Sequence, residues 1–201
     1  MKKRLVVAGC LALLSLSGCS TKSAPIVEYN LDSKLGIEPL EKTKCINNSL
    51  QVALPFSQKS LESQQMSYRV GLSKEYAYNQ SLWTQAPTKS IAQQLVETLS
   101  KSKIFKTVQL YKSRAKTDYL LETDVEDFMQ YFSKDEQSSY GVVTLRFTLI
   151  DRKNSTVIET TRFSTQVDVK QLNAEGGVDA LSEALSKVLV QNVEWLHKVC
   201  R

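Results

Sequence analysis

The chain has 201 residues, of which 42% are hydrophobic and 23% charged, a length and balance typical of one globular domain with a sizeable core. Its formal net charge is +5 at neutral pH, but three of those charges belong to Lys2, Lys3 and Arg4. The rest of the chain is nearly neutral, which gives no electrostatic case for a partner made of nucleic acid.

The N-terminus has the form of a lipoprotein signal peptide. A basic head is followed by an apolar run over residues 5–16, too short for a helix to span a bilayer, which takes about 20 residues. Small residues then precede Cys19 in the sequence Leu-Ser-Gly-Cys, a pattern typical of a lipobox. We expect cleavage between Gly18 and Cys19, and acylation of Cys19 with chains such as palmitate. An ordinary signal peptide with an incidental cysteine is the alternative.

The residue after the lipidated cysteine bears on which membrane holds the protein. It is Ser20 rather than aspartate. By analogy with enterobacterial sorting, this favours the outer membrane. We therefore expect a lipid-anchored protein of the cell envelope, with no cofactor beyond the covalent lipid on Cys19.

Two cysteines remain once the signal peptide is removed and Cys19 carries lipid. Cys45 lies near the start of the folded part and Cys200 near its end. Thiols are oxidised beyond the inner membrane, so we expect these two to form one disulfide. Two separate buried thiols are the alternative.

Taken in chain order, residues 19–44 lack periodicity and are expected to be a lipidated tether and an extended lead-in, which leaves residues 45–201 as the domain. Alternation and turn residues predict several strands, and apolar spacing of 3.6 residues predicts two amphipathic helices. The expected elements are a strand at 49–56, a tyrosine-rich hairpin at 68–72 and 75–79, a helix at 87–102, a strand at 107–111, a meander over 119–167 and a helix at 178–198.

The meander carries the clearest strand signal. Apolar residues stand at odd positions in its three runs, for example Leu121, Phe147 and Phe163, and Glu159 breaks that parity. Together these elements predict an α+β fold, with a mixed or antiparallel sheet, a C-terminal β-meander and two amphipathic helices packed on one face.

Residues able to support catalysis are few. His197 is the only histidine and could in principle serve a triad, but a histidine in the last turn of a helix is better explained by the helix dipole. No nucleotide-binding or zinc-protease motif occurs. We therefore expect no catalytic residue, no metal site and a protein that is not an enzyme.

Three acidic residues, Glu122, Asp124 and Glu126, share one face of a predicted strand. An acid–base or cation site is one interpretation. The predicted meander favours another, because it places Asp124 opposite Arg146, with Arg162 on the next strand. Cross-strand ion pairing on the solvent face is the preferred interpretation.

Aromatic residues gather in the predicted hairpin and near the first turn of the meander. They could belong to the core, or they could form an apolar patch that docks a partner. The predicted contacts are Tyr131, Phe132, Tyr76, Tyr78 and Trp83, with the first two preferred because the strand's alternation fails there.

Landmarks spread over the whole mature chain resemble the ABC-type transport auxiliary lipoproteins, a family that includes the paraquat-inducible protein C group. One departure is Leu82, where the family pattern leads us to expect a basic residue before the tryptophan. The landmarks are Tyr29-Asn30-Leu31, Leu50 to Pro55, Tyr68-Arg69-Val70, Trp83 to Pro87, Phe105 to Val108, Ala115 to Leu121, Asp127-Phe128 and Trp195-Leu196.

The resemblance implies a periplasm-facing auxiliary component of an ABC system with an MCE-type subunit, which moves phospholipid or other hydrophobic molecules between membranes and supports envelope integrity. The implied partners are the MCE-domain protein and the permease–ATPase complex, with lipid as a further candidate and self-association left open. An envelope-assembly lipoprotein independent of any transporter is the alternative, and an envelope hydrolase is a third class.

Overall fold

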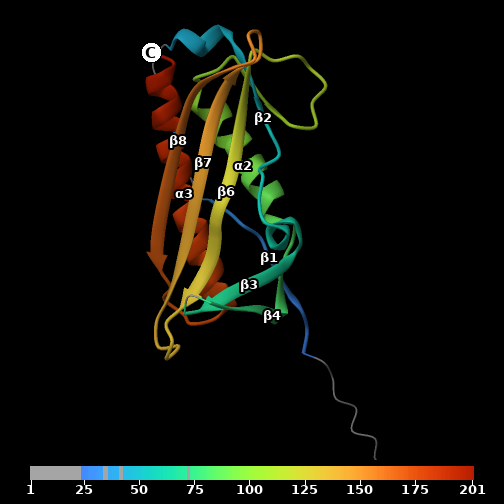
Figure 1. Cartoon of the computed structure of the whole chain (residues 1–201), viewed down its shortest axis with the longest axis vertical. Coiled ribbons are helices and arrows are strands. Elements are labelled where there is room, and N and C mark those ends of the chain that lie inside the picture. Colours follow the sequence, from blue (N-terminus) through green and yellow to red (C-terminus); the bar gives the residue numbers. More distant parts are fainter. Residues whose placement is uncertain (1–23, 34–35, 41–42, 72) are drawn as a thin grey trace, which may run out of the picture.

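A mixed sheet of eight strands runs the length of the molecule, and both long helices lie behind it in Figure 1. The computed structural model describes residues 24–33, 36–40, 43–71 and 73–201. The strands are β1 (Val27–Tyr29), β2 (Ser49–Val52), β3 (Gln65–Val70), β4 (Lys74–Trp83), β5 (Thr107–Leu110), β6 (Tyr119–Phe132), β7 (Ser139–Asp151) and β8 (Thr156–Asp168). The helices are α2 (Pro87–Ser102) and α3 (Ala174–Val199), with short 3-10 helices η2 (Lys44–Asn47) and η3 (Lys59–Glu62).

The central strand of the sheet is β6. Along one side it pairs with β7 over nearly its whole length, and β7 pairs with β8, which completes the predicted meander. Along its other side, β6 pairs with β2 near its start and with β3 near its end, both in parallel. From there the sheet continues to β5 at one end and through β4 to β1 at the other.

A β-bulge in β6, between Val125 and Asp127, changes which residues face the helices. Before the bulge the inward side chains are at odd positions, as predicted, and Leu121 is fully buried. After it they are at even positions, so Phe128 and Phe132 turn inward and are 4% and 8% exposed. The alternation does not fail near Phe132. The extra residue of a bulge shifts it by one position.

Both helices place an apolar stripe against the same face of the sheet, which confirms the predicted α+β fold. Pro87 occupies the first turn of α2, a position where proline suits a helix, and Ile91 and Leu95 are fully buried. Helix α3 starts at Ala174, earlier than predicted, because the Asn173 side chain accepts a hydrogen bond from the Gly176 N–H, 2.9 Å. No helix in the described part of the chain is long and apolar enough to cross a membrane.

Two further departures from the predicted pattern have local causes. Glu159, which breaks the odd parity of β8, lies beside a register shift and accepts a hydrogen bond from Trp195 Nε1 of α3, 2.9 Å. The expected strand at 49–56 ends at Val52, although Phe56 still forms a bridge to Asp124. The lead-in contributes β1 and a buried side chain, Leu31, to the domain.

Candidate functional site

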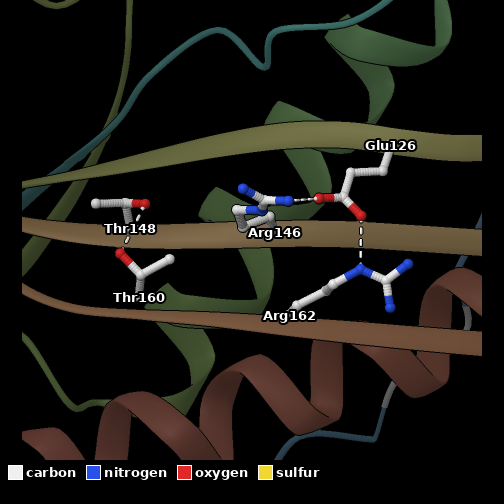
Figure 2. Close-up of polar contacts among 5 residues, drawn as sticks. All are labelled: Glu126, Arg146, Thr148, Thr160 and Arg162. Carbon is white, nitrogen blue, oxygen red and sulfur yellow. Dashed lines mark hydrogen bonds and ion pairs between the residues drawn. The ribbon is translucent and has the colours of Figure 1, made fainter.

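No α-helix of the described residues covers the face of the meander opposite α2 and α3, and we call this face the outer face. Figure 2 shows its centre, where one carboxylate, Glu126 at the bulge, binds two arginines. Arg162 Nε donates to Glu126 Oε2 at 2.6 Å, and Arg146 Nη2 donates to Glu126 Oε1. The hydrogen bonds from Arg162 and Arg146 lower the pKa of Glu126, so that it stays ionised.

The predicted register of the ion pairs is confirmed, but the paired carboxylate is a different one. Asp124 lies opposite Arg146, and Arg146 lies opposite Arg162, as the sequence predicted. The bulge nevertheless brings Glu126, not Asp124, within reach of both guanidinium groups. Ion pairing on the solvent face therefore accounts for the acidic strand.

Hydroxyl groups extend this polar network along the strands. The Oγ1 atoms of Thr148 and Thr160 are 3.2 Å apart (Figure 2), and Thr144 Oγ1 lies 2.7 Å from Ser164 Oγ. Cross-strand pairs of this kind stabilise a sheet and hold its side chains in fixed positions. The centre of the outer face is thus a flat, ordered surface whose polar groups bond to one another.

Phe56 is an exposed aromatic residue on the outer face that the sequence did not predict as a contact. Phe56 forms a parallel bridge with Asp124, which places both side chains on the same face, and 59% of Phe56 is exposed. Single exposed apolar residues are common on protein surfaces, so Phe56 distinguishes this face only together with the ordered ion pairs beside it. The apolar run Leu54-Pro55-Phe56 was the available signal, but it was assigned to the expected strand at 49–56 and therefore was not considered as an exposed segment.

The structure corrects two of the five predicted partner contacts. Trp83 is 4% exposed and packs against Phe128, with ring centroids 5.9 Å apart. Phe132 is 8% exposed and packs against Tyr68 at 5.3 Å. Because both rings are buried, neither is available to a partner protein, and the prediction for them was wrong.

Tyr78, another of the predicted contacts, takes part in a buried hydrogen-bond network around Gln130, which is 2% exposed. Tyr78 Oη donates to Gln130 Oε1 at 2.9 Å, while Gln130 Nε2 donates to Ser139 Oγ and to the Asn173 carbonyl. Burial raises the pKa of Tyr78, so its hydroxyl stays protonated and keeps donating. This network joins β4, β6 and β7 to the start of α3, which gives Tyr78 a structural role.

The other two predicted contacts remain accessible. Tyr76 is 45% exposed and stacks on Tyr68. Tyr131 is half-buried on the outer face, stacks on Tyr140 and donates its hydroxyl to Asp127 Oδ2 at 2.8 Å. Nearby, Arg69 pairs with Glu75 at 3.0 Å, and its guanidinium lies 6.0 Å from the Tyr131 ring centre. At this end of the sheet, Tyr76 is therefore accessible on the helix face. Tyr131, with Tyr140 and Arg69 beside it, is accessible on the outer face.

Substitutions at two adjacent residues of β6 should destabilise the fold by very different amounts. Phe132→Ala removes a buried ring and is expected to lower the free energy of unfolding by about 3 kcal/mol. Tyr131→Phe removes one half-buried hydrogen bond and should cost within about 1 kcal/mol. Chemical denaturation of the two variants measures the difference. Equal stabilities would mean that the bulge does not turn Phe132 into the core.

Asp127 and Glu126 should give the stability opposite pH dependences. Burial raises the pKa of Asp127 above its ordinary 3.8, although the Tyr131 hydrogen bond opposes the shift. The ionised carboxylate therefore destabilises the fold, and this cost disappears as the pH falls through the raised pKa. Asp127→Asn should accordingly be more stable than the parent at neutral pH, with the difference shrinking under acid conditions.

Glu126→Gln is the matched control for that measurement. Since the pKa of Glu126 is lowered in the folded state, its stabilisation is present above its ordinary pKa and is lost as the pH falls through the lowered one. The Glu126→Gln variant should therefore be less stable than the parent at neutral pH and approach it in acid. Thermal melts across this pH range would contradict the account if both variants shifted in the same direction.

Cys45 and Cys200 form the predicted disulfide, with their Cα atoms 5.5 Å apart. The Lys44 N–H also donates to the Cys200 carbonyl at 2.8 Å, so the link ties η2 to the end of α3. Figure 1 shows these two segments side by side near the C-terminus. The predicted cleavage and lipidation at Gly18 and Cys19 lie outside the described residues and stay predictions.

His197 lies in a groove of about 440 Å³ between the lead-in and the last turns of α3. Apolar residues such as Ile37 and Val193 line the groove together with charged ones such as Glu194 and Lys198, and the described lining residues include no serine, threonine or cysteine. None of these described lining residues places a hydroxyl or thiol nucleophile beside His197. Among the residues that the structure describes, no group of acidic, histidine or cysteine side chains could hold a metal ion.

The family model for the ABC-type transport auxiliary lipoprotein component matches residues 29–191. The chain belongs to this family. The match confirms the resemblance found in the sequence and covers the last residue of β1, all the later strands, α2 and most of α3. The family description makes this auxiliary lipoprotein a transport component, and membership of a lipoprotein family indicates a lipid-anchored protein of the envelope.

Solved structures share the fold of the auxiliary lipoprotein at low sequence identity. Protein XCC0632 from Xanthomonas campestris has a TM-score of 0.75 at 18% identity, over 86% of this chain and 96% of its own. An uncharacterized protein gives 0.65 at 14%, over 86% and 99%. The hypothetical protein CT253 from Chlamydia trachomatis gives 0.51 at 8%, over 77% and 98%. No curated protein matches the chain.

Proposed function

We propose that this auxiliary lipoprotein faces the periplasm and acts, without catalysis, as the anchored component of an ABC transport system that has an MCE-type subunit. The system would move phospholipid or other hydrophobic molecules between the two membranes and so contribute to envelope integrity. The observation that carries the proposal is the family match over residues 29–191, nearly the whole described domain.

The outer face supports a docking role rather than a chemical one. Its central carboxylate is ionised and bound to two arginines, and its threonine hydroxyls bond to each other across strands. Groups that are bonded in this way are poor general bases or nucleophiles, because their protons and lone pairs are already engaged. A rigid polar surface with an exposed ring, Phe56, instead suits an interface with a folded protein.

The predicted anchor completes the proposal. Acylation of Cys19 with three chains would make release from the membrane negligible, since each buried CH₂ contributes about 0.8 kcal/mol. We propose the outer membrane as the site of anchoring, because Ser20 follows the cysteine. The domain would then work close to that membrane, and its partner would reach it through the periplasm.

Site-specific photo-crosslinking in living cells tests this function. A photoreactive amino acid at Phe56 or Thr148, on the outer face, should capture the MCE-domain protein or the permease. The same probe at Lys187, an exposed residue of α3 paired with Glu183, is the matched control and should capture neither. Capture from Lys187 alone would place the docking surface on the helices. Envelope defects in a deletion strain without any such capture would favour the transporter-independent assembly role.

A further inference from the structure

The outermost strand of the meander, β8, leaves a long edge of the sheet open. Within the described part of the chain it pairs only with β7 and has 13 residues, whereas the other terminal strands, β1 and β5, have 3 and 4. Sheet edges are normally protected by lysine, proline or covering segments, yet Thr156–Asp168 contains neither lysine nor proline. At the start of β8 a register shift and the inward-facing Glu159 restrict pairing, so the open stretch of the edge is residues 160–168. These features are typical of an edge that adds another strand.

We propose that the added strand is β8 of a second copy of this chain, paired antiparallel about a two-fold axis that passes through Thr165. The axis stands perpendicular to the sheet, so each residue meets one that faces the same side. In this register Arg162 lies opposite Asp168 of the second copy, and Phe163 lies opposite its Val167. The symmetry repeats both pairs, giving two opposite-charge pairs on the outer face and two apolar pairs on the helix face.

Charge decides the register. Asp168 is the only acidic residue of β8 on the face of Arg162, because the other one, Glu159, is turned towards Trp195. Centring the pair on Arg162 itself would overlap the full strands, but it would set two like charges opposite each other, which is destabilising. Alignment of Arg162 with Asp168 is the arrangement that neutralises both.

The side chains needed for these pairs are free to make them. Arg162 holds Glu126 through Nε, which leaves its two terminal nitrogens pointing away from the carboxylate in Figure 2. Arg146 binds the same carboxylate, so Glu126 stays paired if Arg162 shifts. Asp168 makes no ion pair within the ranges of the chain that the structure describes.

This pairing would join the two outer faces into one surface on the same side of a continuous sheet. Both Phe56 rings and both arginine–glutamate networks would then face a single large partner. The inference is independent of the transport role, since it depends only on the edge of β8 and its charges.

Charge reversal tests the register on the full-length lipoprotein in detergent. Sedimentation velocity should show a dimer for the parent, and Asp168→Arg or Arg162→Asp should weaken it roughly ten- to a hundred-fold, because each sets like charges opposite each other twice. The double variant R162D/D168R should restore the dimer. A parent that stays monomeric, or single reversals without effect, would overturn the proposal. Failure of the double variant to recover, with the fold intact by circular dichroism, would also overturn it.

Cysteine crosslinking provides a test that does not depend on charge. Thr165→Cys should form an intermolecular disulfide in the envelope, because the two copies of residue 165 face each other across the axis. Thr161→Cys is the matched control: it is half-buried on the same face of β8, but it lies opposite residue 169. Equal crosslinking of both variants would indicate random collision. Crosslinking of the Thr161 variant alone would indicate another register.

Discussion

Removing the disulfide is expected to lower the free energy of unfolding of the domain by roughly 2–5 kcal/mol. Cys45 and Cys200 are 155 residues apart in sequence, so the bridge closes almost the whole domain into one loop and strongly restricts the unfolded chain. The variant should be Cys45→Ala/Cys200→Ala, because both residues are buried and serine would add an unpaired hydroxyl. The midpoint of thermal unfolding should fall on the order of 10 °C.

Chemical reduction gives the control for this measurement. Treating the parent protein with a reductant should produce a similar fall, while the alanine variant should not respond. The Lys44 hydrogen bond to the Cys200 carbonyl would remain, so the end of α3 should stay docked in the folded state. An alanine variant as stable as the parent would contradict a role for the bridge in constraining the unfolded chain.

Truncating Phe147 is expected to have a comparable effect, about 3–5 kcal/mol. This ring lies in the middle of β7, is fully buried and contacts Phe163 of β8 and Trp195 of α3, with centroids 6.2 and 6.5 Å away. Phe147→Ala leaves a cavity where the meander meets α3, and the surrounding rings can fill only part of it. Equilibrium denaturation by urea measures the loss.

Two further variants calibrate that result. Phe147→Leu keeps most of the side-chain volume and should cost clearly less than alanine. Val157→Ala changes an apolar residue of β8 that is 61% exposed, so the monomer should lose little stability. If Phe147→Ala cost no more than Val157→Ala, α3 would not pack on the meander as the structure shows.

Much of the fold could be predicted because its longest elements have strong periodicity. The pattern of α2 and the register that sets Asp124 opposite Arg146 both follow from spacing and turn positions. Strand β1 was missed because three residues show no usable alternation. The early start of α3 was missed because Gly176 and Gly177, poor helix formers, follow its capping residue Asn173.

The partner contacts were predicted less well, and the bulge in β6 accounts for the error at Phe132. The bulge at Glu126 reverses the parity of β6, which buries Phe132 and leaves Tyr131 on the outer face. Bulges depend on pairing between strands distant in sequence, so a single strand's pattern does not reveal them. Phe56 was missed because the expected strand at 49–56 included it, whereas β2 ends at Val52 and an isolated bridge to Asp124 sets the side that Phe56 faces.

Affinity purification of the tagged, full-length lipoprotein at its native level, with mass spectrometry of what remains bound, tests the proposed function most directly. An MCE-domain protein should be recovered together with a permease or ATPase. Neither should be recovered when the outer face is altered by Phe56→Ser with Thr148→Arg. The variant with Lys187→Ser, on the far side of the domain, should still recover them. Recovery of envelope-assembly proteins alone, from a sample in which the lipoprotein is folded and membrane-bound, would contradict the account.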